Sequence, residues 1–261
     1  MQIGASTANY YPALIEDALE TLLRQGFRDL EVFINTESEI TDSFIDRMAL
    51  SVQQAGARVV SLHSYTSGNE PYLLFSAYER RFQDGCRVFE KIFRAASRLG
   101  ATYVVLHGDR AGGVLSMKES VARFEYLYDM GREQGVTLAQ ENVVRFRASE
   151  LEYLRYMRQT LGDKAHFVLD IKQCRRCGLT WREVLQVMGD RVAHVHVSDW
   201  DDTRDCLPPG TGKEDFAALF RMLQKIGFDG TAMLELYRSD FKSEKDLNDS
   251  AEFLKKTLKN L

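Results

Sequence analysis

The stretch EQGVTLAQEN, residues 133–142, shows the unit from which the fold can be worked out. A polar segment ends at Gly135, a short and mostly apolar run follows, and the run closes on the carboxylate of Glu141. Glycine just past a helix end can adopt the left-handed conformation that stops a helix. A short apolar run bounded by turn residues is typical of a buried strand. The stretch therefore predicts a helix, a turn and a strand, in that order.

The same unit recurs along the chain. The glycines that follow an amphipathic stretch and precede an apolar run are Gly26, Gly56, Gly100, Gly135, Gly162, Gly189 and Gly227. The runs are LEVFI, VVSLH, YVVLH, VTLAQE, HFVLD, VAHVHV and TAMLEL, and QIGAS at the start adds an eighth. Eight strand–helix units in 261 residues match the α/β class and the (β/α)8 TIM barrel in count and length. We expect one such domain over residues 1–261. A doubly wound open sheet is the alternative, but no Gly-x-Gly-x-x-Gly follows the first run.

Local patterns predict where several helices begin. Ser116–Glu119, Ser149–Glu152 and Thr180–Glu183 have the spacing of a capping box, in which the two side chains satisfy free backbone donors. Pro12 suits the first position of the first helix, because proline there sacrifices no hydrogen bond.

Composition and charge narrow the class of protein. The chain is 44% hydrophobic and 28% charged, an ordinary globular composition, with a net charge of −4. This negative charge argues against nucleic acid as a main partner, and no apolar run is long enough to span a membrane. The segment MQIGAST has no secretory pattern, so we expect a cytoplasmic protein. Cys174 and Cys177 form a single CxxC without the second pair that a zinc site would need.

Acidic and imidazole side chains gather where the predicted strands end. They are Glu31, His63, His107, Glu141, Asp170, His196 and Glu235. Because barrel enzymes place their chemistry at the carboxyl ends of the strands, we expect these side chains to share one face of the molecule. Three of the carboxylates interrupt apolar runs, where an unpaired buried charge costs several kcal/mol. A shared metal ion would remove that cost.

The two histidines of HVHVSDWD, residues 194–201, have different expected roles. Residues two apart on a strand share a face, so His194 and His196 point the same way. We expect His196, nearer the strand end, to be a ligand and His194, one layer below it, to be a hydrogen-bonded core residue.

Glu141, Asp170, His196 and Glu235 would form an oxygen-rich ligand set with one nitrogen. Such a set suits a single Mn²⁺, Zn²⁺, Co²⁺ or Mg²⁺ ion. Two glutamates from non-adjacent strands could also stand on opposite faces of a carbonyl compound. One would remove a proton beside the carbonyl and the other would return it elsewhere.

The motifs AQENV, VLDIKQ, HVHVSD and MLELY, read in that order, resemble those of the xylose isomerase-like TIM barrels. That superfamily includes tagatose 3-epimerase, hydroxypyruvate isomerase, inosose dehydratase and endonuclease IV. The resemblance implies that Glu141, Asp170, His196 and Glu235 bind one divalent ion and that the two glutamates are the acid–base pair. It implies an isomerase or epimerase in carbohydrate metabolism that acts on a small keto sugar, sugar phosphate or sugar acid through an enediolate.

Three other functions stay open at this point. A dehydratase of a keto-polyol would begin with the same proton abstraction. An endonuclease IV-like phosphodiesterase would use His63 and His107, but Gln173 and Leu207 stand where the resemblance requires histidines of a third metal site. A non-catalytic sugar-binding barrel would bind its ligand without turnover.

The resemblance also suggests which residues meet the substrate. His63 and His107 would contact substrate hydroxyls or, alternatively, hold a second metal together with Glu141. Gln173 and Arg147 would also meet the substrate, and they stand where the epimerases place a histidine and a second glutamate. These two departures leave the particular substrate open and the four-ligand set intact.

Two residues after strand ends complete the predicted substrate site. Arg204 could bind a phosphate or carboxylate, and Trp200 could pack against the apolar face of a sugar. We expect a small carbohydrate substrate and neither a nucleic-acid nor a membrane partner. The residues leave open whether the protein forms a homo-oligomer.

Overall fold

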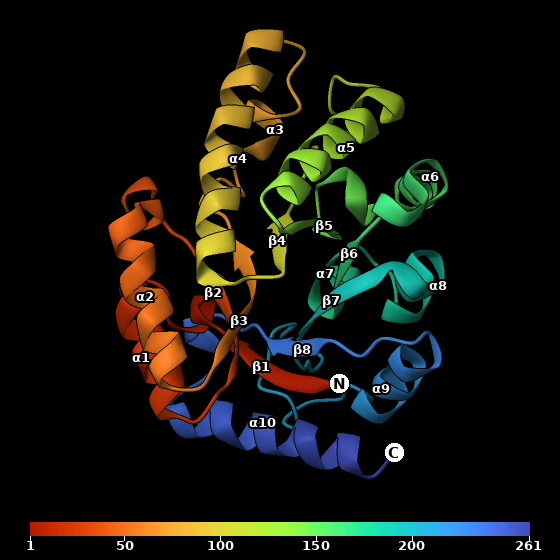
Figure 1. The fold of residues 1–261 in the computed structure, drawn as a ribbon. Helices are drawn as coiled ribbons and strands as arrows, with labels where there is room; N and C mark the ends of the chain where they lie inside the picture. Colours follow the sequence, from red (N-terminus) through yellow and green to blue (C-terminus); the bar gives the residue numbers. More distant parts are fainter.

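The structure is a computed structural model that describes residues 1–261. Eight parallel strands form a closed barrel in sequence order, in which β1 pairs with both β2 and β8 (Figure 1). The strands are β1 (Gln2–Ser6), β2 (Asp29–Phe33), β3 (Arg58–His63), β4 (Tyr103–Leu106), β5 (Thr137–Glu141), β6 (Phe167–Asp170), β7 (Val192–Val197) and β8 (Thr231–Leu234). The predicted (β/α)8 barrel is confirmed.

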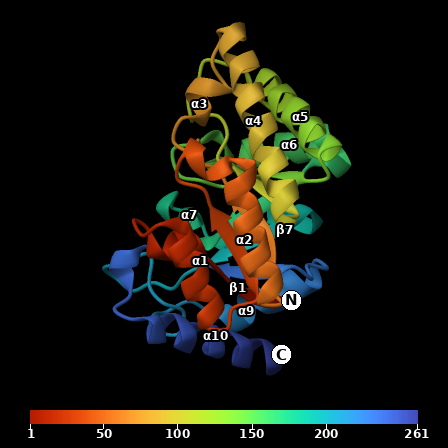
Figure 2. The ribbon, with the colours of Figure 1, turned by 60° about the vertical axis from the view of Figure 1, so that its left-hand side comes forward.

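Helices surround the barrel, and α10 runs along the bottom of the view in Figure 2. The longer ones are α1 (Ile15–Arg24), α2 (Asp42–Gln54), α4 (Glu79–Leu99), α5 (Met117–Glu133), α6 (Leu151–Leu161), α8 (Trp181–Met188), α9 (Phe216–Lys225) and α10 (Glu244–Lys259). Two short helices, α3 (Glu70–Leu73) and α7 (Ile171–Arg176), follow the ends of strands. Single 3-10 turns are η1 (Thr7–Tyr10), η2 (Glu37–Ile40), η3 (Arg147–Ser149), η4 (Gly162–Lys164), η5 (Gly189–Arg191) and η6 (Arg238–Asp240). None of the helices combines the length and the apolar character needed to cross a membrane.

Glycines determine two features of this architecture. The seven glycines predicted to end helices all have φ between +55° and +90°, the region that side chains disfavour. Gly4 in β1 has a different role, since a Cβ there would lie 2.5 Å from the carbonyl oxygen of Asp29 and 2.9 Å from the sulfur of Met233. Strand β1 can therefore pack this closely between β2 and β8 only without a side chain at this position.

The helix starts are predicted only in part. The capping boxes at Ser116 and Thr180 are present. The prediction at Ser149 is wrong, because its hydroxyl donates to the carbonyl oxygen of Phe146 in η3 and α6 starts after Glu150. The prediction for Pro12 is also wrong, since Pro12 lies in a turn and α1 begins only at Ile15.

The barrel interior changes character along the strands. Val105, Ala139 and Val168 form a small buried apolar cluster of their own. Glu141 and Asp170 lie two residues beyond Ala139 and Val168, so they share the same strand faces. On β4 to β6 the interior is thus apolar beneath a layer of titratable side chains.

Candidate metal centre

Four strand ends bring four ligand-type side chains together. Glu141 ends β5, Asp170 ends β6, His196 is the second-last residue of β7, and Glu235 directly follows β8. One donor atom from each of these residues lies within 4.8 Å of those of the other three. The side chain of Glu235 is 13% exposed and the others at most 2%, so only Glu235 reaches solvent appreciably.

The nitrogen Nδ1 of His196 faces one oxygen of each carboxylate. It lies 3.3 Å from Oε1 of Glu141, 3.6 Å from Oε2 of Glu235 and 3.9 Å from Oδ2 of Asp170. The Oδ2 atom of Asp170 is buried and accepts no hydrogen bond. A buried carboxylate oxygen without a donor is costly, and a cation among these four atoms would satisfy it. Three oxygens and one imidazole nitrogen fit a divalent ion of the Mn²⁺ or Zn²⁺ type.

The remaining atoms of Glu141 and Asp170 are held by neighbours. Oε2 of Glu141 lies 3.2 Å from Nε2 of His107 and 3.4 Å from Nε2 of His63. Oδ1 of Asp170 accepts the backbone N–H of Gln173 at 2.9 Å, which caps α7. Asn142 accepts the N–H of Asp170 and donates to its carbonyl oxygen. Each carboxylate is thereby oriented with one oxygen left for the centre.

Lys172 is a member of this site that is not among the ligands and substrate residues predicted from the sequence. It lies in the first turn of α7, and its side chain is 4% exposed. Its ammonium is 2.9 Å from Oε2 of Glu235 and 3.5 Å from Oδ2 of Asp170. It is the only lysine or arginine that pairs with the four ligand-type residues. The available signal was a lysine two positions after a strand-end aspartate.

Glu70 is a second residue that was missed. It lies in α3, in the connection between β3 and α4, and is fully buried. Its Oε2 accepts the N–H of Gly108 at 2.7 Å, which places it beside His107, and its Oε1 has no partner. Burial raises the pKa of Glu70 to about 7, against the opposing charge of His107.

The pKa values of Glu141 and Glu235 are lowered in this site, whereas the pKa of Asp170 is raised. Burial opposes ionisation of Glu141, but hydrogen bonds from His107 and His196 hold its pKa well below the usual value. Burial likewise opposes ionisation of Glu235, and the charge of Lys172 lowers its pKa. Burial raises the pKa of Asp170 to about 7, against the effect of Lys172. Both glutamates are therefore carboxylates at neutral pH, as a proton acceptor must be.

A sequence model described as the xylose isomerase-like TIM barrel matches residues 19–257. The chain belongs to this family. A relative from Mycobacterium leprae, described as uncharacterised, is 26% identical over 93% of this chain and 91% of its own length. The 3-dehydro-D-guloside 4-epimerase of Escherichia coli K12 is 21% identical over 90% of this chain and 92% of its own.

Solved structures of other proteins have the same fold. A D-tagatose 3-epimerase-like protein superimposes with a TM-score of 0.81 at 18% identity, over 100% of this chain and 98% of its own. The IOLI protein, solved with a binding zinc atom, gives a TM-score of 0.76 at 19% identity, over 100% and 97% of the two chains. At such identities the likeness concerns the fold alone.

The histidines predicted to meet substrate lie beside the centre of this xylose isomerase-like barrel. His63, His107 and Glu141 each offer a ligand atom within 4.8 Å of the others, so they could hold a second ion. His63 also stacks on Phe33, with ring centroids 4.4 Å apart. Gln173 is tied down differently, since its side-chain oxygen accepts the N–H of Val144 at 3.2 Å.

The other three predicted substrate residues have partners elsewhere. Arg147 pairs with Asp109 at 2.7 Å and donates to loop carbonyl groups, so it holds the loop after β4 together. Arg204 is largely exposed and pairs with Asp201. Trp200 donates to Glu214 at 3.1 Å, and Arg175 covers its ring at 3.8 Å. These three side chains make loop contacts in this structure, and their contact with substrate stays a prediction.

A mostly apolar pocket of about 380 Å³ opens beside Glu235. It is lined by Ala8, Tyr11, Phe33, Ile34, Asn35, Tyr65, Glu235, Leu236 and Tyr237. Aromatic faces next to a carboxylate are suited to the apolar face of a sugar ring, whose hydroxyls point the other way.

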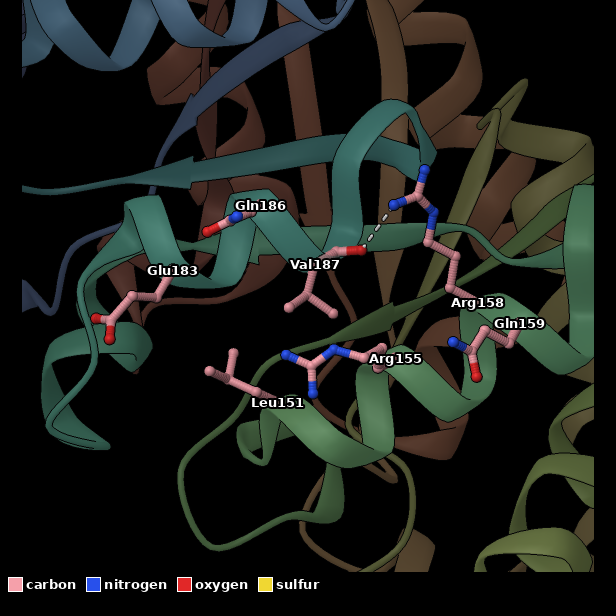
Figure 3. Close-up of a pocket in the computed structure, with 7 residues that line it drawn as sticks. All are labelled: Leu151, Arg155, Arg158, Gln159, Glu183, Gln186 and Val187. Atoms are coloured by element: carbon pink, nitrogen blue, oxygen red, sulfur yellow. Dashed lines mark hydrogen bonds between the residues drawn. The ribbon is translucent and has the colours of Figure 1, made fainter.

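Figure 3 shows a different hollow, of about 530 Å³, on the outside of the barrel between α6 and α8. Its walls are helix side chains such as Arg155, Gln159 and Glu183, and Arg158 donates to the carbonyl oxygen of Val187 at 3.1 Å. None of the candidate ligands lines this hollow, so we do not assign the reaction to it despite its larger volume.

Proposed function

We propose that the protein is a divalent-metal-dependent epimerase or isomerase of a small keto sugar, with Glu141 and Glu235 as the proton-transferring pair. The observation that supports this most is the approach of one oxygen from each of three carboxylates to Nδ1 of His196. The names of the Escherichia coli relative and of the tagatose epimerase-like structure favour epimerisation within this class.

The two glutamates would divide the proton transfer between opposite faces of the substrate. One carboxylate removes the proton on the carbon next to the carbonyl, which leaves an enediolate. The other returns a proton to the opposite face of that carbon in an epimerisation, or to the neighbouring carbon in an isomerisation. Glu141, Asp170, His196 and Glu235 would hold the ion, which when bound supplies positive charge near the enediolate oxygens.

Neighbouring side chains would orient each glutamate for proton transfer. His63 and His107 fix one oxygen of Glu141, so its other oxygen keeps a constant direction. Lys172 holds Glu235 and keeps a positive charge 2.9 Å from it, in the place where substrate oxygens would arrive. We propose that Lys172 donates a hydrogen bond to a substrate oxygen and that Phe33 and Tyr237 pack against the sugar.

The decisive experiment replaces one member of the pair. Glu235→Gln keeps the shape but cannot accept a proton, so turnover on a panel of keto sugars with Mn²⁺, Co²⁺ or Zn²⁺ should disappear. Glu37→Gln, at an exposed glutamate paired with Lys91, is the matched control and should keep wild-type rates. Wild-type rates in the Glu235 variant would reject the assigned role.

Isotope exchange identifies the reaction type. In heavy water the wild-type product should carry deuterium at the carbon that loses its proton. Turnover without deuterium would indicate a hydride shift and contradict the paired glutamates. A labelled product that has also lost one water would identify a dehydratase, and two or three tightly bound zinc ions with cleavage of a phosphodiester would identify an endonuclease IV-like enzyme.

A further inference from the structure

Beneath the candidate centre, Glu31 of β2 concentrates three polar contacts on a single oxygen. Its Oε2 lies 2.8 Å from Oγ of Ser61, 3.1 Å from Nε2 of His196 and 3.3 Å from Nε2 of His194. Glu31, Ser61 and His194 are completely buried, and His196 is 1% exposed. A carboxylate so far from water needs donors. These three side chains surround Oε2, whereas the buried Oε1 has no hydrogen-bond partner.

The strand register places these groups together. Between β2 and β3 the pairing slips after Leu30, so that Glu31 lies opposite Ser61 and Val60 is left as the extra residue. Between β6 and β7 a second slip passes over Ala193 and sets Asp170 opposite His196. A bulge changes the face to which the following side chains point. The two bulges therefore turn Ser61 and both histidines toward Glu31.

The contact with Glu31 determines which ring nitrogen of His196 can bind an ion at the candidate centre. Because Nε2 lies 3.1 Å from a carboxylate oxygen, its proton stays there as the donor of a hydrogen bond. Nδ1 in turn lies 3.3 Å from Oε1 of Glu141, on the side of the centre. An ion there would take the place of the proton between Nδ1 and Glu141, and the lone pair of Nδ1 would then face Glu141, Asp170 and Glu235 while Nε2–H still donates to Glu31. A ligand histidine held by a carboxylate through its other nitrogen has a fixed tautomer and ring orientation and is more basic.

We propose that Glu31 is a positioning residue that makes Nδ1 of His196 the donor atom of the metal centre. The proposal rests on the proposed function only in assuming that His196 binds the ion. Glu31 itself contacts neither substrate nor ion. Its contribution is to hold the imidazole ring in one plane and one tautomer.

A competing interpretation makes Glu31 a ligand. Glu31, His194 and His196 offer atoms within 4.8 Å of one another and could in principle surround a second ion. The contacts of Oε2 disfavour this, because Nε2 of each histidine and the hydroxyl of Ser61 approach that oxygen at hydrogen-bonding distances. Oε1 of Glu31 and Nδ1 of His194, by contrast, are buried without a partner. The number of ions bound per chain separates the two interpretations.

The test measures binding of Mn²⁺ and Zn²⁺ by titration calorimetry, without substrate. Glu31→Gln removes the charge and leaves one acceptor for three donors, so the dissociation constant should rise about 10- to 100-fold. The matched control is Asp29→Asn on the same strand, whose carboxylate bonds to Arg58 and Thr231 at the other end of the barrel. It should leave the dissociation constant within about twofold of the wild-type value.

Nitrogen-15 NMR of the zinc-loaded protein gives a second readout that a merely structural role would not move. In the wild type, Nδ1 of His196 should carry the metal shift and Nε2 the shift of a protonated nitrogen. In Glu31→Gln the two nitrogens should exchange these signatures in part of the population. If this variant does not fold, Glu31→Asp, which keeps the charge but is one methylene shorter, should weaken ion binding in the same direction.

Each alternative outcome has its own meaning. Wild-type affinity and an unchanged His196 spectrum in Glu31→Gln, while His196→Ala loses the ion, would overturn the inference and leave the proposed function standing. Unchanged affinity in His196→Ala would reject the proposed centre itself. Two ions per wild-type chain and one in Glu31→Gln would make Glu31 a ligand and also overturn the inference.

Discussion

Strand β2 carries two carboxylates in opposite circumstances. At the amino end of the barrel, Asp29 accepts two hydrogen bonds from Arg58, at 2.8 and 2.9 Å, and one from Thr231 at 2.6 Å. Glu31 lies two residues further along the strand. It and the acids above it, toward the carboxyl end of the barrel, are held mainly by histidines and hydroxyls, with one lysine among them. The guanidinium of Arg58 is 64% exposed and permanently charged, so Asp29 is neutralised by a fixed partner.

The difference shows what each end can do. A carboxylate matched by a permanent cation stabilises the fold and has no capacity left for a ligand. Carboxylates whose partners can exchange protons can still bind a ligand. Their contribution to the stability of the fold then depends on pH and on bound ions. We therefore expect substitutions at the two ends to separate stability from activity.

The largest expected effect contrasts Glu141→Gln with Asp29→Asn. The first variant should lose about 10²- to 10⁴-fold in kcat, the usual contribution of a positioned proton-transfer group, while the second should keep wild-type kcat and KM. Steady-state kinetics on the best substrate of the keto-sugar panel would measure both. Equal losses in the two variants would show that the two ends are not functionally distinct.

The next effect concerns Glu70 and pH. Because its pKa of about 7 lies above its ordinary value of 4.5, the folded state holds this proton more tightly than the unfolded state. The stability it contributes is complete below pH 4.5 and is lost as the pH rises through about 7. Relative to Glu70→Gln, the wild type should thus lose about 3 kcal/mol of unfolding free energy over this range.

Urea unfolding at several pH values would measure the effect of Glu70, and Asp29→Asn again provides the contrast. Burial opposes ionisation of Asp29, but the hydrogen bond from Arg58 lowers its pKa, so its contribution is present at neutral pH and lost on acidification. The two variants should therefore diverge from wild type in opposite pH directions. Parallel pH curves would contradict this account.

A somewhat smaller effect should come from the ion itself. A divalent ion at 100 times its dissociation constant should stabilise the folded chain by about 2.7 kcal/mol. The rise in Tm should persist in Asp29→Asn and vanish in a double variant that carries Glu141→Gln and Glu235→Gln. A chelator should reverse it. A rise that survives the double variant would indicate that the ion binds elsewhere.

The smallest effect is the loss of stability in Asp29→Asn itself. The asparagine keeps an acceptor for Thr231 but loses the charge that binds Arg58, which is mostly exposed. We expect a loss of about 1 kcal/mol at neutral pH. Denaturant unfolding would measure it, and a loss several times larger would mean that the amino end depends on this pair more than its exposure indicates.

The fold was predictable because its signals are local and repeated. Every strand–helix unit carries its own glycine stop and apolar run, so errors at Pro12 and Ser149 changed no strand. Those errors arose because a capping pattern works only where the backbone places the hydroxyl at the helix start, and Ser149 uses its hydroxyl within η3 instead.

The site was predictable only where the strands carry it. Glu141, Asp170, His196 and Glu235 stand at strand ends, whose common face follows from the barrel. Glu70 lies in a long connection without periodicity, so nothing in the sequence indicates its complete burial. Lys172 follows a strand end but begins a helix, and a lysine there is normally solvated. Its burial depends on the opposing carboxylate of Glu235, which is remote in the sequence.

The pairing of β1 with β8 closes the barrel, so ion binding should depend on closure as well as serve catalysis. All four candidate ligands come from the consecutive strands β5 to β8, whereas Glu31, His63 and His107, which orient His196 and Glu141, come from the first half of the chain. A half-barrel fragment would hold every ligand, but its His196 and Glu141 would lack these partners. During refolding, tight binding of a divalent ion should therefore appear only after the two halves have docked. The absorbance of bound Co²⁺ would then report the time at which the barrel closes.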